Sequence, residues 1–282
     1  MTQLRKATRQ KSKMRLGLSA VSGGGKTYSA LLIAFGLTND WSKIALIDTE
    51  NGSGDLYAHL GEYSVLPLQA PYTPESYINA VKTCESAGME VIIIDSISHE
   101  WEGKGGILDI SNSMTGNSYT NWAKITPRHQ AFIDSILNSS CHIITTVRRK
   151  QDYEMTKDSN GKLQVQKVGL KEITREGFEY EVTINFELDT KHNATVSKDR
   201  TGLFAGKPEF IPSIETGEMI REWCETGVTP IKPELPFIKQ GTKAWNMMLA
   251  HLKNGGSLED MSKFQISDED KTELLNQVNQ PA

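Results

Sequence analysis

Residues 20–27, Ala20-Val21-Ser22-Gly23-Gly24-Gly25-Lys26-Thr27, decide the fold of this chain. They fit the phosphate-binding pattern G-x-x-x-x-G-K-[ST], with Ala20 in place of the first glycine. The glycines let backbone N–H groups turn inward around phosphate oxygens, Lys26 adds a positive charge, and Thr27 offers a hydroxyl to Mg²⁺. We therefore predict that ATP and Mg²⁺ bind here, with nucleotide contacts from Ser22, Gly23, Gly24, Gly25, Lys26, Thr27 and Tyr28.

The residues around this loop favour a ligand-binding loop over a glycine-rich turn without a ligand. Residues 14–19 have the pattern of a short strand, and the apolar residues 26–37 have that of a helix. In a strand–loop–helix unit the phosphates lie at the N-terminus of the helix, where the helix dipole is positive.

Composition restricts the class of protein. The 282 residues carry a net charge of -4, which argues against a uniformly basic nucleic-acid coat but allows local basic patches. Cys84, Cys141 and Cys224 are widely spaced, which excludes a paired zinc motif and fits a reducing, cytoplasmic setting. No apolar run reaches the roughly 20 residues of a membrane helix, and the basic N-terminus lacks the apolar stretch of a secretory signal.

Alternating strand and helix patterns predict an α/β fold. Apolar strands are expected at 14–19, 43–48, 91–95 and 141–147, and helices at 26–37, 74–88 and 127–138. Such strands form a mainly parallel sheet flanked by helices. Antiparallel strands are expected later, in a hairpin over 150–168 around Asn160-Gly161 and at 179–189 and 193–197.

The same patterns divide the chain into four parts. Residues 1–13 form a basic tail, either solvated or touching nucleic-acid phosphates, and 14–228 form the ATPase core. Residues 229–240 read as a Pro-containing linker, and 241–282 as a small helical, acidic region with helices at 241–254 and 268–277. The acidic side chains of this last region are either solvated or dock a partner protein.

Two carboxylates follow apolar strands and are expected beside the loop. Asp95 ends the strand 91–95, where it can organise Mg²⁺ together with Thr27. Glu50 follows the strand 43–48 and can act as a general base toward an attacking water. A surface glutamate is the equally good alternative for Glu50 from its position alone.

The strings Ile47-Asp48-Thr49-Glu50 and Ile92-Ile93-Ile94-Asp95-Ser96 resemble those of RecA-type ATPases. Within that family the stretch 14–210, including Ser98-His99-Glu100-Trp101-Glu102-Gly103, is most similar to the phage Sak-type, core-only recombinase paralogues. The resemblance implies that Glu50 is catalytic and that the enzyme self-associates into a ring or filament. It also implies that Lys198 and Arg200, two apart in an extended segment, reach a neighbouring subunit's ATP. An exposed basic turn is the alternative for this pair.

The strand 141–147 departs from the family pattern at its end. RecA-like proteins carry a nucleotide-sensing Gln or Asn there, whereas this chain has Thr146 or Arg148 in that neighbourhood. The identity of the sensing residue is therefore left open by the sequence.

Two segments predict contact with single-stranded DNA. Residues 101–124, expected as a loop, contain Trp101, Tyr119 and Trp122, which can stack on bases or pack in the core. Residues 148–175 contain eight basic and four acidic side chains, a net charge of +4.

The motifs and the basic and aromatic segments predict a Mg²⁺-dependent ATPase acting on single-stranded DNA, and the resemblance implies a role in phage recombination or replication. A nucleotide-gated binding or adaptor protein and, less well supported, a P-loop small-molecule kinase are the alternatives.

Overall fold

The computed structural model describes residues 4, 6–157, 163–229, 237–257 and 264–279. The chain separates into two compact units, Met1–Val228 and Thr229–Ala282. Most of the expected Pro-containing linker, residues 230–236, lies outside the described residues.

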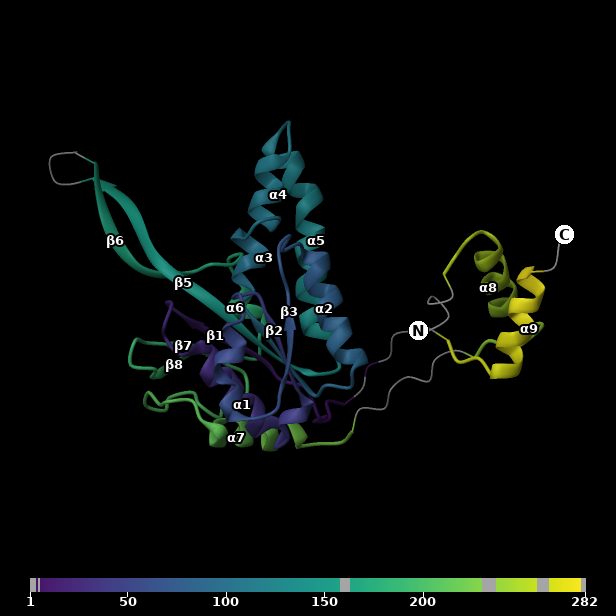
Figure 1. Cartoon of the computed structure of the whole chain (residues 1–282), viewed down its shortest axis with the longest axis horizontal. Coiled ribbons are helices and arrows are strands. Elements are labelled where there is room, and N and C mark those ends of the chain that lie inside the picture. The colour runs from purple at the N-terminus through teal and green to yellow at the C-terminus, as the bar shows by residue number, and fades with distance from the viewer. Residues whose placement is uncertain (1–3, 5, 158–162, 230–236, 258–263, 280–282) are drawn as a thin grey trace. The chain divides into compact units, whose positions relative to one another are not determined.

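The first unit is built on an eight-stranded, mainly parallel sheet with helices on both faces (Figure 1). The strand order is β3-β2-β4-β5-β1-β7-β8, and β6 pairs with β5. Among the strands that the structure describes, β5–β6 and β7–β8 form the antiparallel pairs. The strands are β1 Arg15–Ala20, β2 Ile44–Asp48, β3 Ser64–Pro67, β4 Val91–Asp95, β5 His142–Lys157, β6 Leu163–Glu172, β7 Ile184–Leu188 and β8 Ala194–Asp199. The predicted fold class is confirmed.

Two hydrophobic cores lie on opposite faces of the sheet because successive side chains of a strand point to opposite sides. In β4, Ile93 joins the core beneath α1 (Lys26–Thr38) and α7 (Ile214–Glu225). Its neighbours Ile92 and Ile94 join the core beneath α2 (Pro74–Ser86) and α5 (Ser118–Asn138). Burial on both faces explains why these strands are continuously apolar.

The region expected as a loop over 101–124 is mostly helical, so this expectation is wrong. It contains the end of α3 (Ser98–Glu102), α4 (Ile107–Ser113) and the first part of α5. Helix α5 begins at Ser118, well before the predicted start at 127, because the Asn117 side chain caps it by accepting a hydrogen bond from the Tyr119 N–H. Pro127 lies inside the helix.

The expected late antiparallel pairs are present as β5–β6 and β7–β8, but their bounds differ from expectation. β5 continues without a break from the sheet into a two-stranded ribbon with β6, which projects from the first unit in Figure 1. The predicted turn at Asn160-Gly161 lies outside the described residues. Residues 178–181 form the short helix α6 (Phe178–Glu181) in place of the start of a strand, and β7 begins only at Ile184. The remaining elements of the unit are the 3₁₀ helices η1 (Trp41–Lys43) and η2 (Ser53–Leu60).

Part of the basic N-terminal tail is attached to the first unit, which contradicts a fully solvated tail. The Arg9 guanidinium lies 3.9 Å from the ring centre of Trp223 and donates a hydrogen bond to its carbonyl oxygen at 2.8 Å. The Lys11 and Ser12 N–H groups bond to the carbonyls of Val228 and Cys224. These contacts join the tail to the end of α7.

The second unit holds α8 (Lys243–Lys253) and α9 (Asp268–Asn279) around a small core containing Trp245 and Leu274. Three acidic residues occupy the first turn of α9, where they complement the positive end of the helix dipole. None of the helices in the described part of the chain has the length and apolar content that crossing a lipid bilayer requires.

Helices α1 and α7 touch through a pair of glycines, and this contact generates a stability prediction. A Cβ on Gly36 would lie 2.1 Å from the carbonyl oxygen of Ile214 and 2.7 Å from the Cα of Gly217, both backbone atoms that cannot yield cheaply. We expect Gly36→Ala to lower the free energy of unfolding by about 1–3 kcal/mol in urea denaturation, because the clash outweighs the higher helix propensity of alanine. Glu222→Ala, at an exposed position of α7, should change it by less than about 0.5 kcal/mol. If Gly36→Ala had the same free energy of unfolding as the wild type, α1 and α7 would be able to move apart by enough to admit the methyl group without loss of stability.

Candidate functional site

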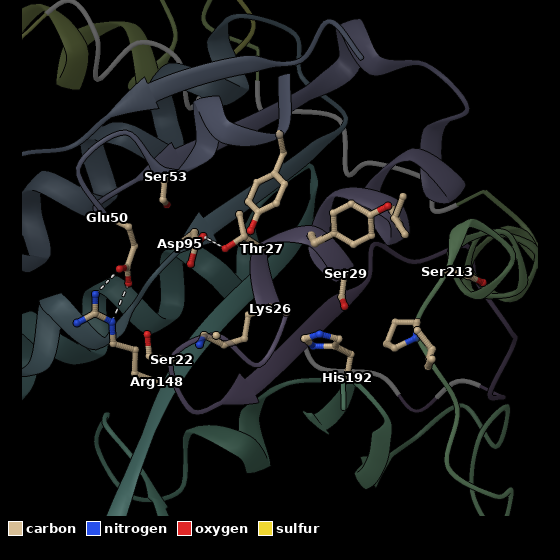
Figure 2. A pocket seen from close by; sticks show the side chains of 17 residues that line it. Ser22, Lys26, Thr27, Ser29, Glu50, Ser53, Asp95, Arg148, His192 and Ser213 are labelled. Carbon is tan, nitrogen blue, oxygen red and sulfur yellow. Dashed lines mark hydrogen bonds and ion pairs between the residues drawn. The ribbon is translucent and has the colours of Figure 1, made fainter. Parts of the chain in front are cut away.

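A cavity of about 670 Å³ opens where the parallel strands end (Figure 2). The ends of neighbouring parallel strands meet at one edge of a sheet, which is where α/β proteins bind ligands. The cavity is lined by residues from the P-loop, α1, η2, the end of β4, the middle of β5, and the turns after β2, after β7 and before α7: Ser22, Gly23, Gly25, Lys26, Thr27, Tyr28, Ser29, Leu32, Glu50, Ser53, Tyr57, Asp95, Arg148, His192, Ile211, Pro212 and Ser213.

The predicted phosphate loop connects β1 to α1 along this cavity. Gly25 adopts a left-handed conformation (φ 83°) just before α1, and the Gly24 N–H bonds to the Val21 carbonyl at 3.1 Å. The His192 ring packs against Gly25, where an added Cβ would lie 2.7 Å from Nδ1. Glycine is therefore required at position 25 both by the backbone angle and by the neighbouring imidazole.

The Lys26 ammonium is held inside the loop. Its side chain is largely buried, and Nζ donates to the carbonyl oxygens of Ala20 at 3.2 Å and Val21 at 3.1 Å. Burial lowers the pKa of Lys26, and the nearby carboxylates of Asp95 and Glu50 oppose that shift. A partly desolvated ammonium that has only neutral hydrogen-bond acceptors is well placed to bind an anion.

Asp95 and Thr27 lie together, as the sequence predicted. The Thr27 hydroxyl donates to Asp95 Oδ2 at 2.5 Å, and the Thr146 hydroxyl donates to Oδ1. Burial raises the pKa of Asp95, and the two hydroxyl donors counteract that rise. One hydroxyl and one carboxylate beside a phosphate site are the hard oxygen donors that Mg²⁺ prefers, so these residues fit the expected ion.

Glu50 faces the cavity, but it is paired with a cation. Arg148 Nε donates to Glu50 Oε1 at 2.8 Å, and Nη2 contacts Oε2, as the dashed lines in Figure 2 mark. Ser96 Oγ donates to the same Oε1 at 3.2 Å. Burial raises the pKa of Glu50, but the hydrogen bonds and charge of Arg148 outweigh it and leave the pKa below its ordinary value.

Lys198 and Arg200 are not brought into this cavity. Both side chains extend from the β8 region to the carbonyl oxygen of Tyr180, which Lys198 Nζ contacts and Arg200 Nη2 reaches at 3.1 Å. Their common target shows that the two cations do share one side, as their spacing predicted. Neither lines the nucleotide cavity of its own chain.

At the other end of the cavity, sequence reasoning predicted Tyr28 but missed the remaining residues. Here the walls are apolar and aromatic, with Tyr28 and Tyr57 rings 5.8 Å apart and the side chains of Leu32, Ile211 and Pro212 nearby. His192 lies between Lys26 and Ser213 in Figure 2. Tyr57, Ile211 and Pro212 come from segments far from the P-loop in the chain, and no local motif marks them. An apolar wall with a few polar groups is suited to a planar heterocyclic base.

The aromatic residues expected to touch DNA lie outside the cavity, on α3 and α5. The Trp101 and Trp122 rings are half-buried, with centres 6.0 Å apart, and Trp101 also meets the edge of His129. Tyr119 is exposed. The buried Glu100 carboxylate contacts His129 Nδ1 at 3.0 Å and so joins α3 to α5. Trp101 and Trp122 therefore both support the packing of these helices and remain partly accessible.

The P-loop connects β1 to α1, and Asp95 at the end of β4 accepts a hydrogen bond from Thr27. This arrangement defines a P-loop NTPase. A family model described as an AAA domain (AAA_24) matches residues 12–210, and the chain belongs to this family of AAA/P-loop ATPases. The family implies a bound nucleotide and, typically, Mg²⁺. No curated protein matches the chain.

The hydroxyl pair on Asp95 gives a testable prediction about Mg²⁺. Thr146→Val removes a donor to the carboxylate while preserving side-chain shape, so we expect the Mg²⁺ concentration needed for half-maximal binding of Mg²⁺–nucleotide to rise by about tenfold or more. The measurement is a Mg²⁺ titration of nucleotide binding followed by a fluorescent ATP analogue. Thr145→Val is the matched control, because its buried hydroxyl donates to the Leu16 carbonyl and not to a carboxylate. Identical titrations for the two variants would contradict the role given to Thr146.

Proposed function

We propose that this protein is a Mg²⁺-dependent, RecA-like ATPase that hydrolyses ATP to ADP and phosphate and couples the reaction to single-stranded DNA. The observation that carries the ATPase proposal is the convergence of Lys26, Thr27, Glu50 and Asp95 on one cavity. A recombination or replication role in a phage is supported by the resemblance of residues 14–210 to Sak-type paralogues.

In this proposal each group has a distinct role. The loop N–H groups and Lys26 bind the triphosphate, while Thr27 and Asp95 hold Mg²⁺, which supplies positive charge to the phosphates. Glu50 accepts a proton as a water oxygen bonds to the terminal phosphorus and the bond to the ADP oxygen breaks. The apolar end with Tyr28 and Tyr57 holds the base.

The proposed DNA contact is supported by two features close to the cavity in the fold. The β5–β6 ribbon begins on the strand that carries Arg148, and its described base includes Arg149 and Lys150. The partly accessible Trp101 and Trp122 lie on the helices that follow β4. Cations that track phosphates and rings that stack on bases together provide binding without sequence preference.

Hydrolysis measured with and without single-stranded DNA tests the proposal. We expect DNA to stimulate the wild type and Lys26→Ala to lose at least about 100-fold in rate, because the ammonium that meets the phosphates is gone. Lys43→Ala, at a lysine of η1 outside the cavity, is the control and should retain full activity. Equal rates of hydrolysis with and without single-stranded DNA would refute only the coupling to DNA. The absence of hydrolysis under every condition would refute the ATPase proposal.

Self-association is part of the proposal, because Lys198 and Arg200 lie outside their own cavity. Two cations on one side of β8 could instead complete the site of a neighbouring subunit, where they would stabilise charge on the phosphates. Their shared contact with a single carbonyl oxygen can be exchanged for a stronger contact with an anion.

Mixing two inactive variants tests this sharing of residues. Lys26→Ala keeps the two cations, and the Lys198→Ala/Arg200→Ala double variant keeps the phosphate loop. In a random equal mixture roughly a quarter of the sites combine an intact loop with an intact neighbour, so we expect ATPase activity to return to about that fraction of the wild type. Mixing Lys26→Ala with the Lys26→Ala/Lys198→Ala/Arg200→Ala triple variant is the control that must stay inactive. If the first mixture has no more ATPase activity than the sum of its two components, Lys198 and Arg200 do not complete the site of a neighbouring subunit.

One observation favours a second candidate, a nucleotide-gated binding protein with slow turnover. The Arg148 pairing occupies both oxygens of the proposed base. If Glu50→Gln retains full biological activity while ATP stays bound, the binding function is favoured over the hydrolytic one.

A further inference from the structure

A buried pair of ionisable side chains joins α3 to α5, outside the nucleotide cavity. The exposed fractions of Glu100 and His129 are 1% and 4%, and Nδ1 of the imidazole contacts both carboxylate oxygens, at 3.0 and 3.1 Å. Burial raises the pKa of Glu100, and the hydrogen bond and charge of His129 oppose that rise. Because the carboxylate accepts the hydrogen of Nδ1, the second ring nitrogen, Nε2, is left for another partner.

This second nitrogen of His129 faces a separate cavity of about 310 Å³. Nε2 forms no hydrogen bond with the described part of the chain, yet it is not one of the unpaired polar atoms there that are shut off from solvent. Solvent therefore reaches it, and the cavity that His129 lines provides the opening. The walls come from α5 and from residues 175–181, and they share no residue with the walls of the nucleotide cavity.

Arg175 lines the same cavity and brings a positive charge to it. It is half-buried, and its guanidinium forms no ion pair with any of the residues whose positions are described. Glu172 and Glu179 border it in an adjoining cavity, but neither pairs with it. A guanidinium that is partly desolvated and has no carboxylate partner favours the binding of an anion from solution.

The two carboxylates that line the cavity are exposed and have cations beside them. Glu176 contacts Lys171 Nζ at 2.5 Å. Glu181 lies near Lys198, since burial and Arg200 lower the pKa of that lysine and Glu181 opposes the shift. Exposed charges are screened by salt, so the half-buried guanidinium and the buried imidazole decide what the cavity binds.

The donors of the cavity suit a phosphate group better than a metal ion. Arg175 offers a fork of N–H groups, and the Thr126 hydroxyl lies three residues before His129, on the same side of α5. Phosphate oxygens accept several such hydrogen bonds at once. The described residues include no group of three or more His, Cys, Asp or Glu side chains that could hold a metal ion.

His129 also lies against a residue proposed to stack on DNA bases. The Trp101 ring meets the imidazole edge-on, with ring centres 5.6 Å apart, and is itself only half-buried. In a nucleotide one sugar separates the phosphate from the base, so a base on Trp101 brings a phosphodiester into the neighbourhood of His129. Single-stranded DNA is therefore one source of a phosphate for this cavity, and free phosphate is the other.

We propose that Arg175, His129 and Thr126 form a phosphate-binding site that is separate from the nucleotide cavity. The ligand is a phosphate group, supplied by a phosphodiester of single-stranded DNA or by free phosphate. Glu100 is a positioning residue: it holds the imidazole and, with the bound phosphate, favours the charged form whose Nε2–H donates to a phosphate oxygen. The site does not depend on the proposed function, whereas DNA as its source rests on that function.

Calorimetric titration of the full-length protein with inorganic phosphate tests the free ligand. The measurements use the Lys26→Ala background, in which the P-loop competes less for phosphate. There Arg175→Ala should weaken phosphate binding by about tenfold or more, because it removes charge-assisted hydrogen bonds. Arg128→Ala is the matched control and should change the affinity little, since this arginine pairs with Glu75 and does not line the cavity.

Nuclear magnetic resonance of protein labelled with ¹⁵N at histidine reports on His129 without altering the site. A saturating phosphate or oligothymidylate ligand should move the Nε2 resonance of His129 toward that of a charged imidazole, and His129→Gln identifies the resonance by its loss. Glu100→Gln should reduce this movement, because an amide does not stabilise the charge. An Nε2 resonance that neither ligand moves would overturn the assignment of His129 to the site.

Fluorescence anisotropy with labelled oligothymidylate over a range of salt concentrations distinguishes the two sources. If a phosphodiester occupies the site, Arg175→Ala weakens DNA binding and reduces the slope of log affinity against log salt by about 0.7. If free phosphate alone occupies it, Arg175→Ala weakens phosphate binding and leaves the DNA titration unchanged. If Arg175→Ala changes neither titration while its free energy of unfolding matches that of the wild type, the inference is overturned. Binding that depends on Arg175 in a protein that hydrolyses no ATP would refute the proposed function and leave this site intact.

Discussion

The register of four parallel strands is the constraint on which the site depends. Asp48 lies opposite Asp95 across β2 and β4, and Ala20 lies opposite Arg148 across β1 and β5. Because parallel strands end at a common edge, these pairings carry the P-loop, Asp95 and Arg148 to one side of the sheet, with Glu50 two residues beyond Asp48. A slip of one residue would turn each side chain toward the opposite face and separate them.

The second constraint is electrostatic. Two cations and two carboxylates share a partly desolvated cavity, and each charged group has a specific partner or donor: Lys26 has backbone carbonyls, Asp95 two hydroxyls and Glu50 a guanidinium. Buried charges are tolerated only with such contacts. The contacts of Lys26 and Arg148 are also the ones that a bound anion could replace.

Sequence reasoning predicted the parts of the fold and site that are determined locally. The strands ending at Asp48 and Asp95 were recognisable because burial on both faces makes them continuously apolar. The P-loop was recognisable because its glycines and lysine are adjacent in the chain. The cavity walls at Tyr57 and Ile211 were not recognisable, since these residues are brought together only by folding. The helical nature of 101–124 was missed because its Gly, Ser and Asn residues suggested a loop, whereas the Asn117 side chain caps a helix there.

Strand β5 contributes side chains to several of these contacts. Along five residues it presents Thr146 to Asp95, Arg148 to Glu50, Arg149 to Glu187 and Lys150 to Glu102. The same strand then continues to Lys157 as one half of the ribbon paired with β6. A strand is stiff along its length because its hydrogen bonds fix each residue to a neighbouring strand. β5 thus connects Arg148, which lines the nucleotide cavity, with the ribbon proposed to bind DNA, and its pairing with β6 shifts register between Asp152 and Tyr153.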